Sequence, residues 1–221
     1  MASRAPRLGF FSLAILLVAT WGVDFAERYA LRRAATQYDA GVIQKLMLVS
    51  TGLDVVLGLG FVGALLALCL APRSTRVVVL AQIAATLAAL SVLMRGGVVL
   101  LFLGGAFAAG EGGLGTVMQL QATAVTLADA TGSALLLVVL SRVAKAAGAP
   151  GARWLAMGGL TLVLGRMAVI GVSLALGDDL ATRAVLEQVQ GWAYLGYALL
   201  TLGLCLHAGV VVTRIPDELP G

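Results

Sequence analysis

The sequence has few of the residues that build metal and haem centres. It contains one histidine, His207, and two cysteines, Cys69 and Cys205, which lie in separate apolar stretches and form no CxxC pair. Metal and haem centres need several imidazole or thiolate ligands. We therefore expect no metal ion and no cofactor bound by this chain alone, and we expect both thiols to pack as small buried hydrophobes.

Charged residues are also scarce: they make up 12% of the 221 residues, whereas 60% are hydrophobic. Soluble domains contain about 25% charged residues and about half apolar ones. A water-soluble chain of this length could not bury so much apolar surface, so the composition predicts an integral membrane protein in contact with the lipid bilayer. The net charge of +4 comes from basic residues that flank apolar stretches singly or in pairs. That pattern is typical of topology signals and not of a nucleic-acid-binding surface.

No proline falls inside an apolar stretch. Six stretches reach or approach the ~20 residues of a membrane-spanning helix, and they are 8–26, 42–70, 77–103, 116–140, 154–177 and 188–212. We predict an all-α fold: a polytopic membrane helical bundle of six transmembrane helices, arranged as three hairpins in one domain over residues 1–221. The first helix is expected to be retained and to continue through Asp24, Glu27 and Arg28, because no signal-peptide cleavage site follows it. The glycine-rich stretch Gly104–Gly115 is expected to be a mobile outer loop.

The flanking charges predict the orientation. One side of the membrane carries eight basic residues against Asp217 and Glu218, and the eight are Arg4, Arg7, Arg73, Arg76, Arg142, Lys145, Arg153 and Arg214. The positive-inside rule places that side in the cytoplasm. We therefore expect a multi-pass protein of the cytoplasmic membrane with its N- and C-termini in the cytoplasm.

Scarce polar residues recur at a fixed spacing within the apolar stretches. At shifts of 75 and 71 residues the matched polar pairs are Gln44/Gln119, Thr51/Thr126, Asp54/Asp129 and Arg95/Arg166. Matches between polar residues carry more weight here than matches between apolar ones, because polar residues are rare in membrane spans. The spacing predicts an internal repeat of about 74 residues, in which the three hairpins have parallel orientation.

Four charged residues, Asp54, Arg95, Asp129 and Arg166, lie well inside apolar stretches. A charge there costs several kcal/mol unless it is paired or hydrated. In each hairpin the aspartate and the arginine lie equally far from the basic residues at the turn, at 19 residues in the first hairpin and 13 in the second. Equal distances mean equal depth in an antiparallel hairpin, at ~1.5 Å per residue. The spacing therefore predicts two ion pairs, Asp54–Arg95 and Asp129–Arg166.

Small and hydroxyl-bearing side chains share helix faces with these four charges, which predicts that the charges point into the bundle. Their hydroxyl groups could donate hydrogen bonds to the carboxylates. The supporting polar residues are Ser50, Thr51, Ser91, Thr126 and Ser133. Gln44 and Gln119 lie nearer the outer ends, where they would line a vestibule or cap their helices.

The sequence leaves three classes of function open. The first, which we expect, is a non-enzymatic membrane subunit or assembly or scaffold component, stapled by intramembrane Asp–Arg pairs and packed against other membrane subunits or further copies of itself. The second is a small proton- or ion-coupled transporter or channel that uses Asp54 and Asp129, although the unbroken helices count against it. The third and most remote is an intramembrane aspartyl-type hydrolase, but Thr51-Gly52-Leu53-Asp54 lacks the GxGD pattern of that group.

Overall fold

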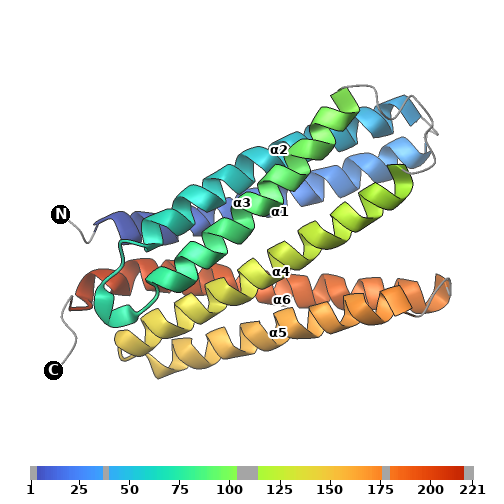
Figure 1. The fold of residues 1–221 in the computed structure, drawn as a ribbon. Coiled ribbons are helices and arrows are strands. Elements are labelled where there is room, and N and C mark those ends of the chain that lie inside the picture. Colours follow the sequence, from blue (N-terminus) through green and yellow to red (C-terminus); the bar gives the residue numbers. More distant parts are fainter. Residues whose placement is uncertain (1–3, 37–39, 104–113, 176–179, 217–221) are drawn as a thin grey trace.

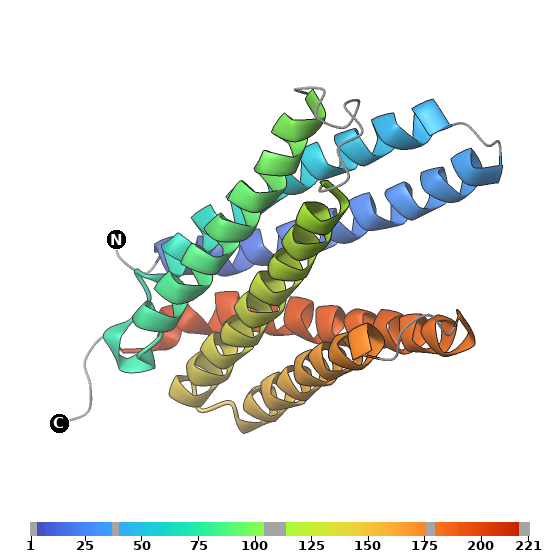
Figure 2. The same cartoon turned by 45° about the vertical axis from the view of Figure 1, so that its right-hand side comes forward.

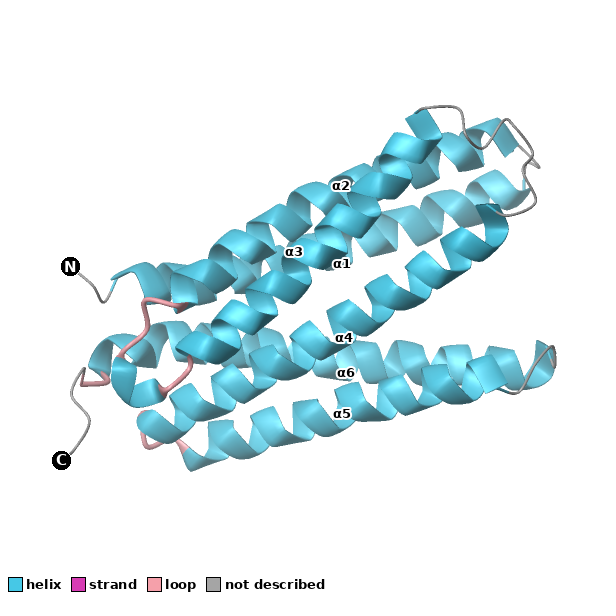
Figure 3. Cartoon of the chain, in the orientation of Figure 1, coloured by secondary structure: helices cyan, strands magenta, loops and turns pink. Residues whose placement is uncertain are grey.

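The computed structural model describes residues 4–36, 40–103, 114–175 and 180–216, which form six α-helices and two short 3-10 turns. The helices are α1 (Arg4–Thr36), α2 (Ala40–Leu68), α3 (Val78–Leu103), α4 (Leu114–Ala146), α5 (Pro150–Ala175) and α6 (Leu180–Val211). The 3-10 turns are η1 (Arg73–Thr75) and η2 (Val212–Arg214). The described residues contain no β-strand (Figure 3), so the all-α prediction is confirmed for them.

Several helices extend beyond the apolar stretches that predicted them. α1 continues past Ala26 to Thr36, so Asp24, Glu27 and Arg28 lie on the helix as expected. α4 begins at Leu114, inside the predicted outer loop, and the rest of that loop, 104–113, lies outside the described residues. Helices run past their apolar segments because Glu, Lys, Arg and Ala have high helix propensity and an aqueous or interfacial environment accepts their polar ends.

Five helices are long and apolar enough to cross a membrane, and they are α1, α2, α3, α4 and α6. Large apolar side chains remain exposed on the outside of the bundle, such as Val56 at 64% and Leu93 at 71% of their accessible surface. Water would penalise so much exposed apolar surface, whereas lipid would not. These features indicate a multi-pass membrane protein. The count of six spans, the identity of the membrane and the orientation of the termini stay predictions.

The two short connections at one end of the bundle follow from local backbone chemistry. α4 ends in a turn in which Gly148 has φ of +67° and the Ala149 N–H donates to the Ala144 carbonyl at 2.9 Å. Glycine adopts that left-handed conformation without steric cost. Pro150 then opens α5, where its missing N–H would have had no helical partner. We call this end, which holds η1 and the 147–149 connection, the turn end.

The six helices form a closed ring in chain order. Each helix packs against the next, and α6 returns to pack against α1. The helices converge at the turn end and spread apart toward the opposite end (Figures 1 and 2). The largest fully buried side chains gather near the turn end, among them Phe10, Leu68, Leu140 and Val143. Close packing there leaves a space inside the ring further along the bundle.

Candidate functional site

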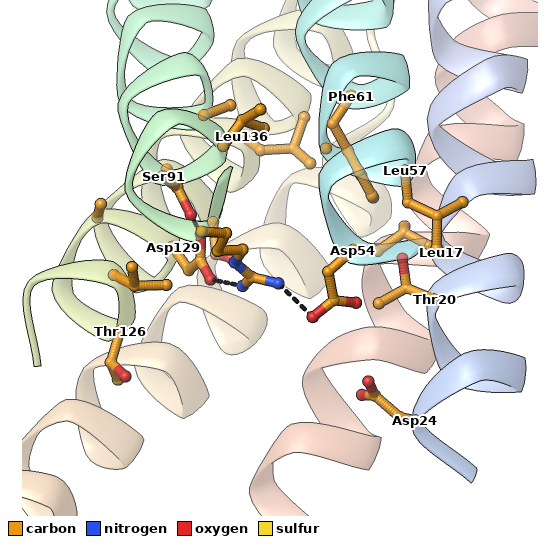
Figure 4. A pocket seen from close by; sticks show the side chains of 18 of the residues that line it. Leu17, Thr20, Asp24, Asp54, Leu57, Phe61, Ser91, Thr126, Asp129 and Leu136 are labelled. Atoms are coloured by element: carbon orange, nitrogen blue, oxygen red, sulfur yellow. Dashed lines mark hydrogen bonds and ion pairs between the residues drawn. The ribbon is translucent and has the colours of Figure 1, made fainter. Parts of the chain in front are cut away.

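The centre of the helix ring holds a cavity of about 630 Å³ to which all six helices contribute. Ligand sites typically have volumes of about 300–1,000 Å³. Three aspartates and three arginines line it: Asp24, Asp54, Asp129, Arg28, Arg95 and Arg166. Nearer the turn end the lining is apolar, and Figure 4 shows Leu57, Phe61 and Leu136 on one side of the charged groups and Asp24 and Thr126 on the other. The cavity is therefore amphipathic, with a charged zone and an apolar wall.

Arg95 connects two carboxylates across three helices. Its Nη1 donates to Asp54 Oδ2 on α2 at 2.6 Å, and its Nη2 donates to Asp129 Oδ2 on α4 at 2.5 Å. The Ser91 hydroxyl, one turn before Arg95 on α3, donates to Asp129 Oδ1 at 2.7 Å. Dashed lines in Figure 4 mark the two contacts of the guanidinium, which lies between the two aspartates.

Helix direction explains how Arg95 reaches both acids. The Arg142 Nη1 donates to the Arg76 carbonyl at 2.7 Å, so these two residues lie at one level at the turn end. Arg95 is 19 residues beyond that level and Asp129 is 13, a difference of about 9 Å along the helix axis. Side chains tilt toward the N-terminus of their helix, and α3 and α4 are antiparallel. The two side chains therefore extend toward each other and close this gap.

The predicted pair Asp129–Arg166 is wrong, because Asp129 pairs with Arg95 instead. The Arg166 guanidinium carbon lies 5.0 Å from the ring centroid of Tyr194 on α6, a cation–π contact. Equal depth fixes a residue's position along the helix axis but not the direction in which it faces. Asp129 faces α3, whereas Arg166 faces α6.

Arg166 is the one guanidinium of the cavity that has no acidic neighbour among the described residues. Arg95 bonds to two aspartates, and Arg28 interacts electrostatically with Asp24 one turn earlier on α1. The Arg166 Nε is buried and has no hydrogen-bond partner. Arg166 is also the only described residue of α5 that lines the cavity.

Asp24 belongs to the cavity, whereas the sequence analysis placed it among the flanking charges. It lies near the Tyr194 hydroxyl, with Oδ2 3.5 Å from it. A periodic stripe could have indicated its position, because Leu13, Leu17, Thr20 and Asp24 recur every three or four residues and all line the cavity. The aromatic residues Tyr194 and Tyr197 were also missed, since an aromatic residue near a span end is more often a membrane-interface anchor.

The supporting hydroxyl groups divide into three sets. Ser91 bonds to Asp129 as predicted, while Ser50 donates to Glu27 Oε1 at 2.9 Å and not to Asp54. Thr51 and Thr126 donate to backbone carbonyls four residues earlier, a bond that hydroxyl side chains commonly make within helices. Ser133 lines the cavity. The side chains of Gln44 and Gln119 lie outside the described part of the structure.

The contacts bear on the predicted repeat as well. Asp54 and Asp129 share one partner, but Arg95 and Arg166 have different ones. The structural equivalence therefore holds for the aspartates and not for the arginines, and the repeat stays a prediction.

The helices on which the shared arginine depends are held in close register. Gly58, one turn after Asp54 on α2, packs so tightly against Val92 on α3 that a Cβ at this position would collide with the Val92 Cγ2 methyl. On the other side of α3, the Gln121 side chain donates to the Met94 carbonyl. These contacts fix α2 and α4 on either side of α3, which places Asp54 and Asp129 within reach of one guanidinium.

Compared with known protein families, with curated proteins and with solved structures, the chain shows no match. The chemistry of the cavity is therefore inferred from its own residues.

Proposed function

We propose that the chain is a non-enzymatic integral membrane protein that moves protons or small cations through its central cavity. The observation that carries this proposal is the sharing of Arg95 between Asp54 and Asp129. One guanidinium neutralises only one carboxylate, so the group retains one excess negative charge. In a low-dielectric environment such a charge favours uptake of a proton or a cation.

The accessibility of the three side chains supports transport over a purely structural role. Asp54 is 25% exposed, Arg95 28% and Asp129 43%, and all three line the cavity. A buried structural ion pair is typically enclosed by packed side chains. Carboxylates that face an open space can exchange protons or ions with it. The cavity therefore reverses the order in which the sequence ranked the subunit and the transporter.

The arrangement of the two aspartates supports a non-enzymatic role. In an aspartyl hydrolase two carboxylates share a proton directly. Here a guanidinium lies between Asp54 and Asp129, and a fixed positive charge at that place would hinder the sharing of a proton and the activation of water.

The second candidate is the membrane subunit or scaffold component, for which the Arg95 bridge would be a staple. One side chain joins α2, α3 and α4, and a buried polar contact of this kind can fix the register of helices. In that case the protein would pack against other membrane subunits or copies of itself, and the cavity would have no traffic.

Reconstitution into liposomes separates the two candidates. We expect the purified protein to carry protons into vesicles that contain a pH-sensitive dye when a membrane potential is imposed. Asp54→Asn and Asp129→Asn should each reduce that flux at least tenfold, while the matched control Asp217→Asn should leave it unchanged. Variants that fold and transport like the wild type would overturn the proposal. A wild type with no flux above empty vesicles, isolated with a stoichiometric partner, would establish the subunit role.

A further inference from the structure

Arg166 differs from the other charged residues of the cavity in having a cavity-facing position without a counter-ion. It contacts the Tyr194 ring, its Nε is buried without a hydrogen-bond partner, and no carboxylate among the described residues pairs with it. An isolated cation in a low-dielectric environment is costly. The cost falls when an anion binds, so the position is suited to receive one.

Stacking on Tyr194 also orients the guanidinium. A guanidinium held by its face presents its edge to a ligand, and that edge matches the two oxygens of a carboxylate in a bidentate contact. Tyr194 lines the cavity next to Arg166, so the aromatic ring supplies a preformed support and the binding edge needs little ordering when a ligand arrives.

The rest of the cavity defines the ligand further. Toward the turn end its wall consists of apolar side chains, including Leu57, Phe61 and Leu136 (Figure 4). Three aspartates share the cavity with Arg166 and would repel a multiply charged anion such as phosphate. A volume of about 630 Å³ accommodates a molecule larger than an inorganic ion.

We infer that the cavity binds a small organic monocarboxylate, whose carboxylate contacts Arg166 and whose apolar part lies against the leucine and phenylalanine wall. This inference rests on the proposed function, because it names the substrate that accompanies the transported proton or cation. Arg166 is then the substrate-binding residue, whereas Asp54 and Asp129 carry the coupled charge.

Binding to the full-length protein in mild detergent tests the inference, with hexanoate as the probe and isothermal titration calorimetry as the readout. Hexanoate should bind, and hexanamide, which has the same apolar chain but no charge, should bind at least tenfold more weakly. Arg166→Gln should weaken hexanoate binding about 10- to 100-fold, the range for one charge-assisted hydrogen-bonded contact. Arg166→Lys keeps the charge without the planar fork and should have an intermediate affinity. Arg153→Gln, a matched exposed position on the same helix, should bind like the wild type.

Three results would overturn the inference: hexanamide binding as well as hexanoate, hexanoate binding unaffected in both Arg166 variants, or inorganic phosphate displacing hexanoate. A loss of thermal stability in Arg166→Gln would leave Arg166→Lys and the hexanamide comparison as the deciding measurements. Failure here is distinguishable from failure of the proposed function. Proton flux that depends on Asp54 and Asp129 can persist without hexanoate binding, and hexanoate can bind to a protein that carries no protons.

Discussion

The shared arginine predicts a specific pattern of coupling energies. Arg95→Gln removes the charge but keeps a side chain of similar length, and it leaves Asp54 and Asp129 without their common partner. Exchanging the charges of Asp54 and Arg95 is not a suitable test, because an aspartate at position 95 would then face Asp129. Double-mutant cycles with Asp54→Asn and Asp129→Asn isolate each contact instead.

The magnitudes follow from geometry and exposure. A hydrogen bond between charged groups contributes about 1.5–3 kcal/mol when it is shielded from water, and exposure reduces that value. Asp54 is 25% exposed and Asp129 43%. We expect a coupling energy of about 1–2 kcal/mol for Arg95 with Asp54 and about 0.5–1 kcal/mol for Arg95 with Asp129. Asp129 also keeps its bond from Ser91 when Arg95 is replaced.

Thermal unfolding in mild detergent, followed by tryptophan fluorescence, gives the test. A total loss of about 2 kcal/mol in Arg95→Gln should lower Tm by about 4–8 °C for a chain of this size. Arg153→Gln should change Tm by less than about 1 °C, because most exposed substitutions have small effects. The account of the shared arginine is refuted if Arg95→Gln is no more destabilising than Arg153→Gln, or if the effects of Arg95→Gln and Asp54→Asn are simply additive.

Three further predictions test the surroundings of the cavity. Gly58→Ala should destabilise the protein by about 1–3 kcal/mol, because the added methyl collides with Val92. Gly63→Ala on the same helix, where a Cβ meets nothing within 4 Å, should be neutral or slightly stabilising. The pair is compared by thermal unfolding, and equal effects would contradict the close approach of α2 and α3. Tyr194→Leu should weaken the support of Arg166 and destabilise by about 1–2 kcal/mol beyond Tyr194→Phe, which keeps the ring. Equal Tm values for the two Tyr194 variants would exclude a cation–π contribution. In the folded protein a maleimide should modify Cys69, which is partly exposed, faster than the fully buried Cys205, as peptide mass spectrometry can show; equal rates would contradict the packing of α6.

The helical architecture was predictable because it depends on a signal spread over many residues. Six apolar stretches free of proline correspond to the six helices, and errors were confined to the ends, as at α1 and α4. Charged and small polar residues at those ends extend a helix without adding to its apolar run. Hydropathy alone could not place such ends.

The site was predictable only along the helix axes. Counting residues from the turns indicated that Asp54 and Arg95 lie at similar depth, and the structure places them 2.6 Å apart. The same count paired Asp129 with Arg166, because depth contains no information about which neighbour a helix face meets. That information depends on the order of the helices in the ring and on the long reach of an arginine side chain, neither of which is encoded within a single hairpin.

Asp24 was missed for a related reason. Its neighbours Glu27 and Arg28 made the region resemble a polar flank, although Leu13, Leu17 and Thr20 share its face. Following the periodic stripe beyond the apolar run would have placed Asp24 in the cavity. A charge next to a span end is therefore better assigned by its helix face than by its distance from the apolar segment.

The central claim is that the charged residues face an aqueous cavity in the membrane and are not sealed in a dry staple. Single-cysteine variants on α4 in reconstituted vesicles test it most directly, after Cys69 and Cys205 have been replaced by alanine. Thr126 and Ser133 line the cavity, whereas Thr131 is exposed and does not line it. We predict that a charged methanethiosulfonate reagent, which reacts with thiols in water, modifies Thr126→Cys and Ser133→Cys at least tenfold faster than Thr131→Cys. Equal protection of all three variants would contradict an aqueous cavity.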